Sequence, residues 1–169
     1  MSSEFEKIKS EIMQFRRFTE NEKQLEQLEI ETDIQRIERD KLFLQESGAI
    51  QLFVEIRDAE LVKWTINDPA KIFLEDPDPN PNNPKAVIAV LQYNYRKSRD
   101  SHEHDTCSTV GISVLNSELY IHLLTRDHSR IEKHRISSRK LADSIVKSIK
   151  NPISTNLSPD NTPNTYIYK

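Results

Sequence analysis

The 169 residues carry a formal net charge of only −3, so the chain as a whole has no strong electrostatic attraction for nucleic acid. Hydrophobic residues make up 36% of the chain, which suits one folded domain with an appendage and excludes the profile of a disordered chain. The only two glycines, Gly48 and Gly111, exclude phosphate-binding loops and nucleophile elbows, which need several glycines in one motif.

The single cysteine, Cys107, excludes a disulfide framework and fits a reducing compartment. The N-terminus has neither the basic stretch nor the apolar core of a signal peptide. No apolar run approaches the ~20 residues that a membrane helix needs. The sequence therefore predicts a cytoplasmic or otherwise intracellular protein with no membrane partner, and no motif in it calls for a cofactor.

Residues 3–46 form the dominant pattern, because they contain neither glycine nor proline. Gly48 follows them and suits the left-handed position after the end of a helix. A continuous helix of this length spans ~65 Å, which is too long to lie wholly on the core of a small domain. Ser3 and Glu6 have the spacing of a capping box at the start of this helix. Thr19 and Glu22 have the same spacing, so two helices in tandem remain an alternative.

Eight apolar side chains of this segment fall on one stripe at 100° per residue. They are Phe5, Ile8, Ile12, Phe15, Ile30, Ile34, Ile37 and Leu44. No single heptad phase continues from end to end, so a regular two-stranded coiled coil is not established. We expect the first seven of these residues to bind another helix, from a second copy or from a partner protein. Packing of the stripe on the chain's own sheet is the alternative.

After Gly48 the period of the apolar pattern changes. Apolar residues alternate with others over residues 50–56 and again over residues 62–66, which predicts two strands. The competing interpretation is a helix, because a helical period also fits Ile50, Phe53, Val54, Leu61 and Trp64.

The central part of the chain predicts two further strands and a loop between them. Residues 72–74 form a short apolar run typical of an edge strand. Residues 75–85 contain four prolines, which prevent a helix or strand and predict an extended surface loop, with a docking segment as the alternative. Residues 86–91 are apolar at every position, as in a central strand that is covered on both faces.

The last part of the chain predicts a hairpin, a helix and a tail. Asn116-Ser117 lies between two alternating segments and predicts the turn of an antiparallel hairpin. Ser138 is the expected N-cap of a final helix that ends before Pro152. Residues 153–169 are rich in Ser, Thr, Asn and Pro and predict disorder, with a short strand at residues 166–168 as the alternative.

This order of elements predicts an α+β fold, with a long N-terminal helical arm followed by a mostly antiparallel sheet and a C-terminal helix packed on one face. The expected organisation is a helical arm over residues 1–47, with a coiled coil as one interpretation, an α+β domain over 48–151, and a flexible tail over 152–169.

Charge is unevenly distributed along the chain. Residues 126–150 contain eight Lys or Arg and three Asp or Glu, whereas residues 1–47 contain eight and twelve. A basic patch could contact phosphates, or it could pair with the acidic arm. The candidate phosphate-binding residues are Arg126, Arg130, Lys133, Arg135, Arg139 and Lys140.

A polar segment near the middle contains residue types that bind zinc. His102, His104 and Cys107 are weak candidate ligands, with Asp105 between them. Their spacing departs from that of metallo-hydrolases, and a structural zinc site needs four ligands. A solvated polar loop is therefore the favoured interpretation, and no metal site is predicted.

These observations predict a non-catalytic protein–protein interaction or assembly module, not an enzyme, that oligomerises or docks through its N-terminal helix. The first alternative is a nucleic-acid-binding protein that uses residues 126–140. The second alternative is a small metal-dependent hydrolase around His102 and His104.

Overall fold

The computed structural model describes residues 3–95, 106–124, 127, 130–152 and 165–167. It contains a long N-terminal helix, an antiparallel sheet and a C-terminal helix packed on that sheet, so the predicted α+β class is confirmed. The helices are α1 (Ser3–Glu46), α2 (Ala49–Asp58) and α3 (Leu141–Lys150), with a short 3-10 helix, η1 (Ser138–Lys140). The strands are β1 (Lys71–Glu75), β2 (Val87–Tyr95), β3 (Thr106–Leu115), β4 (Glu118–Leu124), β5 (Ile131–Arg135) and β6 (Thr165–Ile167).

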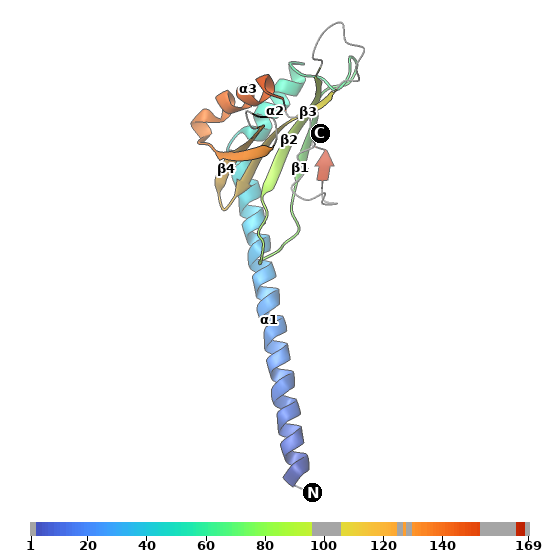
Figure 1. Ribbon diagram of the computed structural model, residues 1–169, viewed down its shortest axis with the longest axis vertical. Helices are drawn as coiled ribbons and strands as arrows, with labels where there is room; N and C mark the ends of the chain where they lie inside the picture. Colours follow the sequence, from blue (N-terminus) through green and yellow to red (C-terminus); the bar gives the residue numbers. More distant parts are fainter. Residues whose placement is uncertain (1–2, 96–105, 125–126, 128–129, 153–164, 168–169) are drawn as a thin grey trace.

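The helix α1 is continuous, and its N-terminal part extends as a long rod from the rest of the fold, which we call the head together with the last turns of α1 (Figure 1). The alternative of two tandem helices is wrong. The hydroxyl of Thr19 donates to the backbone carbonyl of Phe15 at 3.0 Å, which is a bond made inside a helix and not at a cap. Gly48 follows the end of α1 with φ of 85°, so its predicted left-handed conformation is confirmed.

The sheet has the strand order β5-β4-β3-β2-β1-β6, and each neighbouring pair is antiparallel. Strands β1 to β5 form a meander, in which each strand pairs with the next one along the chain. The predicted hairpin is confirmed, because Leu115 pairs with Glu118 across the turn. Asn116 and Ser117 have φ of 52° and 59°, the pair of positive values that a type I′ turn requires.

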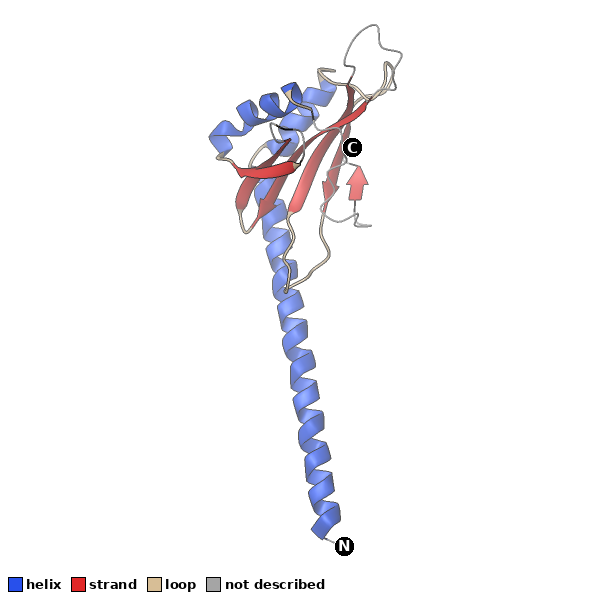
Figure 2. Ribbon diagram, in the orientation of Figure 1, coloured by secondary structure: helices blue, strands red, loops and turns tan. Residues whose placement is uncertain are grey.

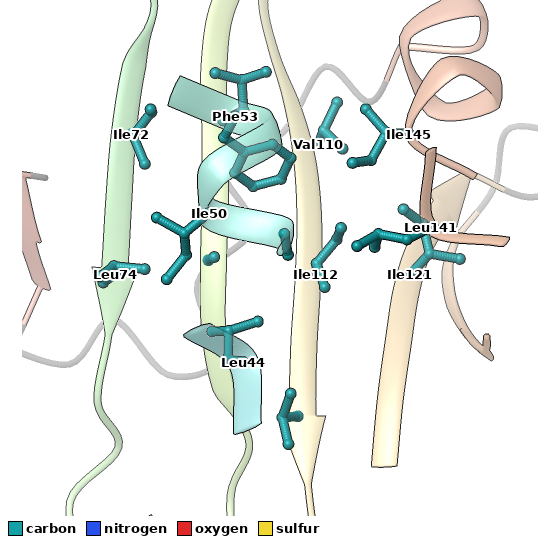
Figure 3. Packing of buried hydrophobic residues seen from close by; sticks show 14 of the residues in the cluster. Leu44, Ile50, Phe53, Ile72, Leu74, Val110, Ile112, Ile121, Leu141 and Ile145 are labelled. Carbon is teal, nitrogen blue, oxygen red and sulfur yellow. The ribbon is translucent and has the colours of Figure 1, made fainter. Parts of the chain in front are cut away.

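The hydrophobic core lies on one face of the sheet, under α2, α3 and the last turns of α1 (Figure 2). Phe53 of α2 is fully buried over the strands, with Leu44 of α1 below it and Ile145 of α3 beside it (Figure 3). Truncating a buried phenylalanine such as this one to alanine typically costs about 3–5 kcal/mol. The end of α1 is therefore part of the head, and the domain boundary expected after residue 47 lies inside the continuous core.

The opposite face of the sheet carries a second, smaller cluster. Ile88 and Val90 of β2 are buried there and pack against Phe73 and Ile131. The expectation that this strand is covered on both faces is borne out, because every residue from Val87 to Leu91 is buried.

The strand predicted over residues 50–56 is wrong, because the segment forms α2. Ile50 and Phe53 face the core together, as the competing helical interpretation requires. That interpretation is wrong beyond Asp58, because the helix ends there and Leu61 and Trp64 lie in the following loop. Gln51 and Glu55 are exposed on the opposite side and hydrogen-bond to each other at 3.1 Å, one helical turn apart. The alternation of apolar residues fits both periods over so short a segment, and packing on the sheet selects the helix.

The strand predicted over residues 62–66 is also wrong. The segment forms a loop with one isolated antiparallel bridge, between Lys63 and Pro69. Asn94 of β2 donates its backbone N–H to the carbonyl of Lys63 at 2.9 Å, which holds the loop against the end of the strand. Ile66 is 84% exposed, so the alternating pattern here does not bury a face.

The end of the chain differs from the sequence prediction in two places. Ser138 begins η1, and α3 follows from Leu141 without a side-chain cap. The strand β6 pairs with the outer edge of β1, so the short-strand alternative holds for the end of the tail. The predicted disorder of residues 153–164 lies outside the described part of the chain.

Candidate interaction surface on the N-terminal helix

The first thirty residues of α1 make up a surface that the head does not cover. The side chains of residues 3–32, which we call the distal arm, are all exposed except that of Thr19, which is half-buried. Asp33 is the first buried residue along the helix. At 1.5 Å per residue the distal arm spans ~45 Å beyond the head.

Asp33, Arg36 and Asp40 form a buried salt-bridge network at the base of this arm, where α1 joins the head. Arg36 donates from Nε to Asp33 Oδ1 at 2.7 Å and from Nη1 to Asp40 Oδ2 at 3.0 Å. Asp40 is fully buried, and its two oxygens accept the backbone N–H groups of Asn116 and Ser117 at 2.9 and 2.8 Å. The carboxylate of Asp40 thus joins the helix to the β3–β4 turn.

The loop between β1 and β2 supplies a second attachment and runs alongside α1 (Figure 1). The backbone N–H of Asn80 donates to Asp33 Oδ2 at 2.7 Å, and Lys41 Nζ pairs with Asp76 Oδ2 at 2.7 Å. Pro77 is buried in the same loop. The proline-rich segment is thus the predicted connection between two strands, and it also contacts α1.

The contacts that attach Asp33 to Arg36 and Asn80 also lower its pKa. Burial raises the pKa, but the hydrogen bonds from Arg36 and from Asn80 N–H, together with the charge of Arg36, outweigh burial. The net effect holds the pKa of Asp33 below its ordinary value of 3.8. The carboxylate is therefore ionised at neutral pH, as the attachment requires.

Six of the seven predicted partner-binding residues form part of the exposed stripe. Phe5, Ile8, Ile12 and Phe15 lie on the distal arm with at least half of each side chain exposed, and Ile30 and Ile34 are about two-fifths exposed. Ile37 is the exception, because it is only 6% exposed and lies in the head's own core. Its assignment to a partner surface is corrected, since the same side chain already packs within the head.

Four further exposed apolar side chains of the distal arm lie outside the predicted stripe. They are Met13, Phe18, Leu25 and Leu28. In the sequence they fall away from the line through Ile8 and Ile12, and that geometry alone gave no reason to include them. Their exposure appears only in the structure, in which no other described element covers this length of the helix.

The basic segment is partly neutralised within the head. Arg130 pairs with Glu132 at 2.6 Å, and Arg135 pairs with Glu118 at 3.2 Å. Lys133 is exposed on β5, and the remaining candidates Arg139 and Lys140 are exposed on η1. Arg126 lies outside the described residues. The described candidates thus lie on β5, next to it and on η1, and carboxylates of Glu118 and Glu132 lie beside two of them.

The candidate zinc ligands receive no support from the described residues. His102 and His104 lie outside them, and only the backbone of Cys107 is described, in β3. No group of three or more His, Cys, Asp or Glu side chains that could hold a metal is found within the described ranges.

His122 is a buried histidine that the sequence analysis left unassigned. It lies on the face of the sheet opposite the main core, with Nε2 3.0 Å from Ser113 Oγ. Burial, and secondarily the charge of Lys133, lowers the pKa of His122 from 6.5 to about 4. The imidazole is therefore neutral at pH 7 and acts as a hydrogen-bonding part of the sheet.

No family, curated protein or solved structure matches this chain in sequence or fold. Among the helices that the structure describes, none combines the length and the apolar composition needed to cross a membrane.

Proposed function

We propose that the protein is a non-catalytic assembly module that oligomerises, or docks on a partner protein, through the distal arm of α1. One observation supports this proposal above all. Nine of the fourteen large hydrophobic side chains that are exposed among the described residues lie on this one helix segment. Concentrated apolar exposure of this kind marks interaction surfaces, whereas scattered single residues do not.

The physical state of the distal arm supports the same conclusion. Helices in proteins gain most of their stability from packing an apolar face, because intrinsic helix propensity is weak. Residues 3–32 contact no other described element closely enough to bury a side chain fully. A partner helix would supply the missing contacts and remove the apolar stripe from water.

The head has a different role in this proposal. Its core is complete without the distal arm, since the buried residues of α1 begin at Asp33. The salt-bridge network of Asp33, Arg36 and Asp40 attaches the arm rigidly to the head. Association of two arms would therefore position their heads relative to each other.

Light scattering and sedimentation of the full-length chain test the proposal. We expect a mass above the 19.8 kDa of one chain that rises with concentration. The double variant Ile8→Glu with Ile12→Glu places two charges on the stripe and should lower the mass to that of one chain. The full chain is required, because a truncation at Gly48 would remove Ile37 and Leu44 from the core.

A matched control separates the stripe from the helix as such. Ser10→Glu with Gln14→Glu adds the same two charges with the same spacing on the opposite side of α1. This variant should keep the wild-type mass. Self-association is contradicted if the wild type and both variants have the mass of one chain at every concentration, which would leave only docking on a different protein.

A further inference from the structure

We propose that the occupant of the apolar stripe is the distal arm of a second copy of this chain, aligned in parallel and in register over residues 5–19. This inference rests on the proposed function and adds to it the identity of the partner and the direction of pairing. It is carried by the charges that flank the stripe.

The distal part of the stripe has the spacing of a coiled-coil seam. Phe5, Ile8, Ile12 and Phe15 are separated by three, four and three residues, as positions a, d, a and d of a heptad are. Thr19 occupies the next a position. All five side chains lie on a straight, continuous helix with no proline or glycine between them.

The two flanks of this seam carry opposite charges. Glu4 and Glu11 occupy the g positions directly before the a residues Phe5 and Ile12. Lys9 and Arg16 occupy the e positions, directly after each d residue. All four are exposed, and among the described residues none of them makes an ion pair within the chain.

Parallel pairing matches these flanks. In a parallel two-stranded coiled coil each g residue lies beside the e residue five positions later on the other helix. Glu4 then faces Lys9 of the second copy, and Glu11 faces Arg16 of the second copy. The two-fold symmetry doubles the count, so that four attractive pairs form.

Antiparallel pairing places like charges together. In that arrangement g residues face g residues and e residues face e residues. The acidic flank of one arm would lie along the acidic flank of the other, and the basic flanks would do the same. The charge pattern therefore selects one direction, and it also favours a second copy, which carries the complementary flank itself.

The same heptad frame sets the extent of close pairing. Glu22, Glu26 and Glu29 occupy the next d, a and d positions, so the seam becomes acidic beyond Thr19. Like charges facing each other across a seam are destabilising. Close contact is thus confined to about two heptads, and we expect concentration-dependent association with both heads at the same end of the pair.

Charge reversal tests the direction of pairing. Glu4→Lys with Glu11→Arg makes both flanks basic, and Lys9→Glu with Arg16→Glu makes both flanks acidic. Each double variant should weaken association by about tenfold in dissociation constant at low salt, and less at high salt. The quadruple variant exchanges the two flanks and should restore wild-type association. Lys7→Glu with Arg17→Glu, which face away from the seam, should have little effect.

Cysteine cross-linking tests the register directly. In a Cys107→Ser background, Phe5→Cys and Thr19→Cys place single thiols at a positions, where identical residues lie side by side in a parallel pair. Both variants should form disulfide-linked dimers on oxidation. Gln14→Cys, on the outer side of the helix, should not. An antiparallel pair can bring only one position opposite itself, so it cannot cross-link at both sites.

The outcomes separate this inference from the proposed function. Association that survives both charge-reversed variants, or cross-linking at no more than one site, overturns parallel pairing while self-assembly through the arm stands. A wild-type chain that stays monomeric up to about millimolar concentration overturns the second copy as the partner. Weakening by each reversal, restoration by the exchange and cross-linking at both positions support the inference.

Discussion

At the scale of single residues, the carboxylate of Asp40 joins α1 to the β3–β4 turn. It accepts two backbone N–H groups of the β3–β4 turn and one N–H of Arg36, all in a fully buried position. We predict that Asp40→Ala lowers the free energy of unfolding by about 3 kcal/mol, because it leaves the two backbone donors without a partner and removes one of the two carboxylates that pair with the buried Arg36. Urea denaturation at fixed protein concentration measures this loss.

The control for this prediction is Asp143→Ala, which removes an exposed carboxylate from the first turn of α3. We expect a change within about 0.5 kcal/mol. Equal effects of the two substitutions would contradict the assignment of Asp40 as the anchor of the arm.

The lowered pKa of His122 should make the stability of the fold depend on pH. Its pKa is about 4 in the folded protein and 6.5 when unperturbed, so the unfolded chain binds the proton first as pH falls. The contribution of His122 to the free energy of unfolding is therefore fully present above about pH 6.5. The free energy of unfolding should fall by about 3 kcal/mol on acidification to pH 4. The substitution His122→Gln should remove most of this loss, as denaturant titrations at several pH values would show.

The effect of His122 can be separated from those of His134 and Asp33. His134→Gln removes an exposed histidine of β5 and should leave the slope between pH 4 and 6.5 nearly unchanged. Asp33 acts in a lower window, because a lowered carboxylate pKa stabilises the fold above its ordinary value of 3.8 and the effect is lost as pH falls further. An unaltered pH profile in His122→Gln would show that the imidazole is not buried in its neutral form.

At the scale of elements, Gly48 lets α1 and α2 meet at an angle. Its φ is 85°, and a Cβ atom added there would meet no atom within 4 Å. The cost of Gly48→Ala is therefore conformational and not steric, and we predict about 1 kcal/mol of destabilisation. Gly48→Asn should cost less, because asparagine tolerates the left-handed region. Thermal or urea unfolding of both variants measures the difference, and an equal cost for both would contradict this explanation.

At the scale of the whole molecule, the protection of α1 amides against hydrogen exchange should be lost at the point along the helix where contacts with the core end. In the monomeric Ile8→Glu with Ile12→Glu variant, we predict that amides of residues 3–32 exchange hydrogen rapidly. Amides of residues 33–46, which contact the head, should stay protected. In the associated wild type, protection should extend into residues 5–19. Uniform protection of α1 in the monomeric variant would contradict a distal arm that depends on association.

The sequence alone determined the elements whose signals are local. An uninterrupted segment before Gly48 specified the long helix, because no residue within it breaks the hydrogen-bonding pattern. The run from Val87 to Leu91 specified a central strand, and Asn116-Ser117 specified a hairpin, since its backbone conformation and the alternation beside it are both local properties. Most of the apolar stripe of α1 could be listed from periodicity.

The tertiary structure decided every question in which two local patterns were equally good or in which burial depended on distant residues. Residues 49–58 are a helix because Ile50 and Phe53 meet the sheet on one face, and alternation alone could not exclude a strand. Ile37 belongs to the core while Ile8 and Ile12 remain exposed, although all three lie on one stripe, because the head contacts α1 only from Asp33 onward. The periodicity of a helix defines its apolar face, but only the position of the other elements determines how much of that face is left for a partner.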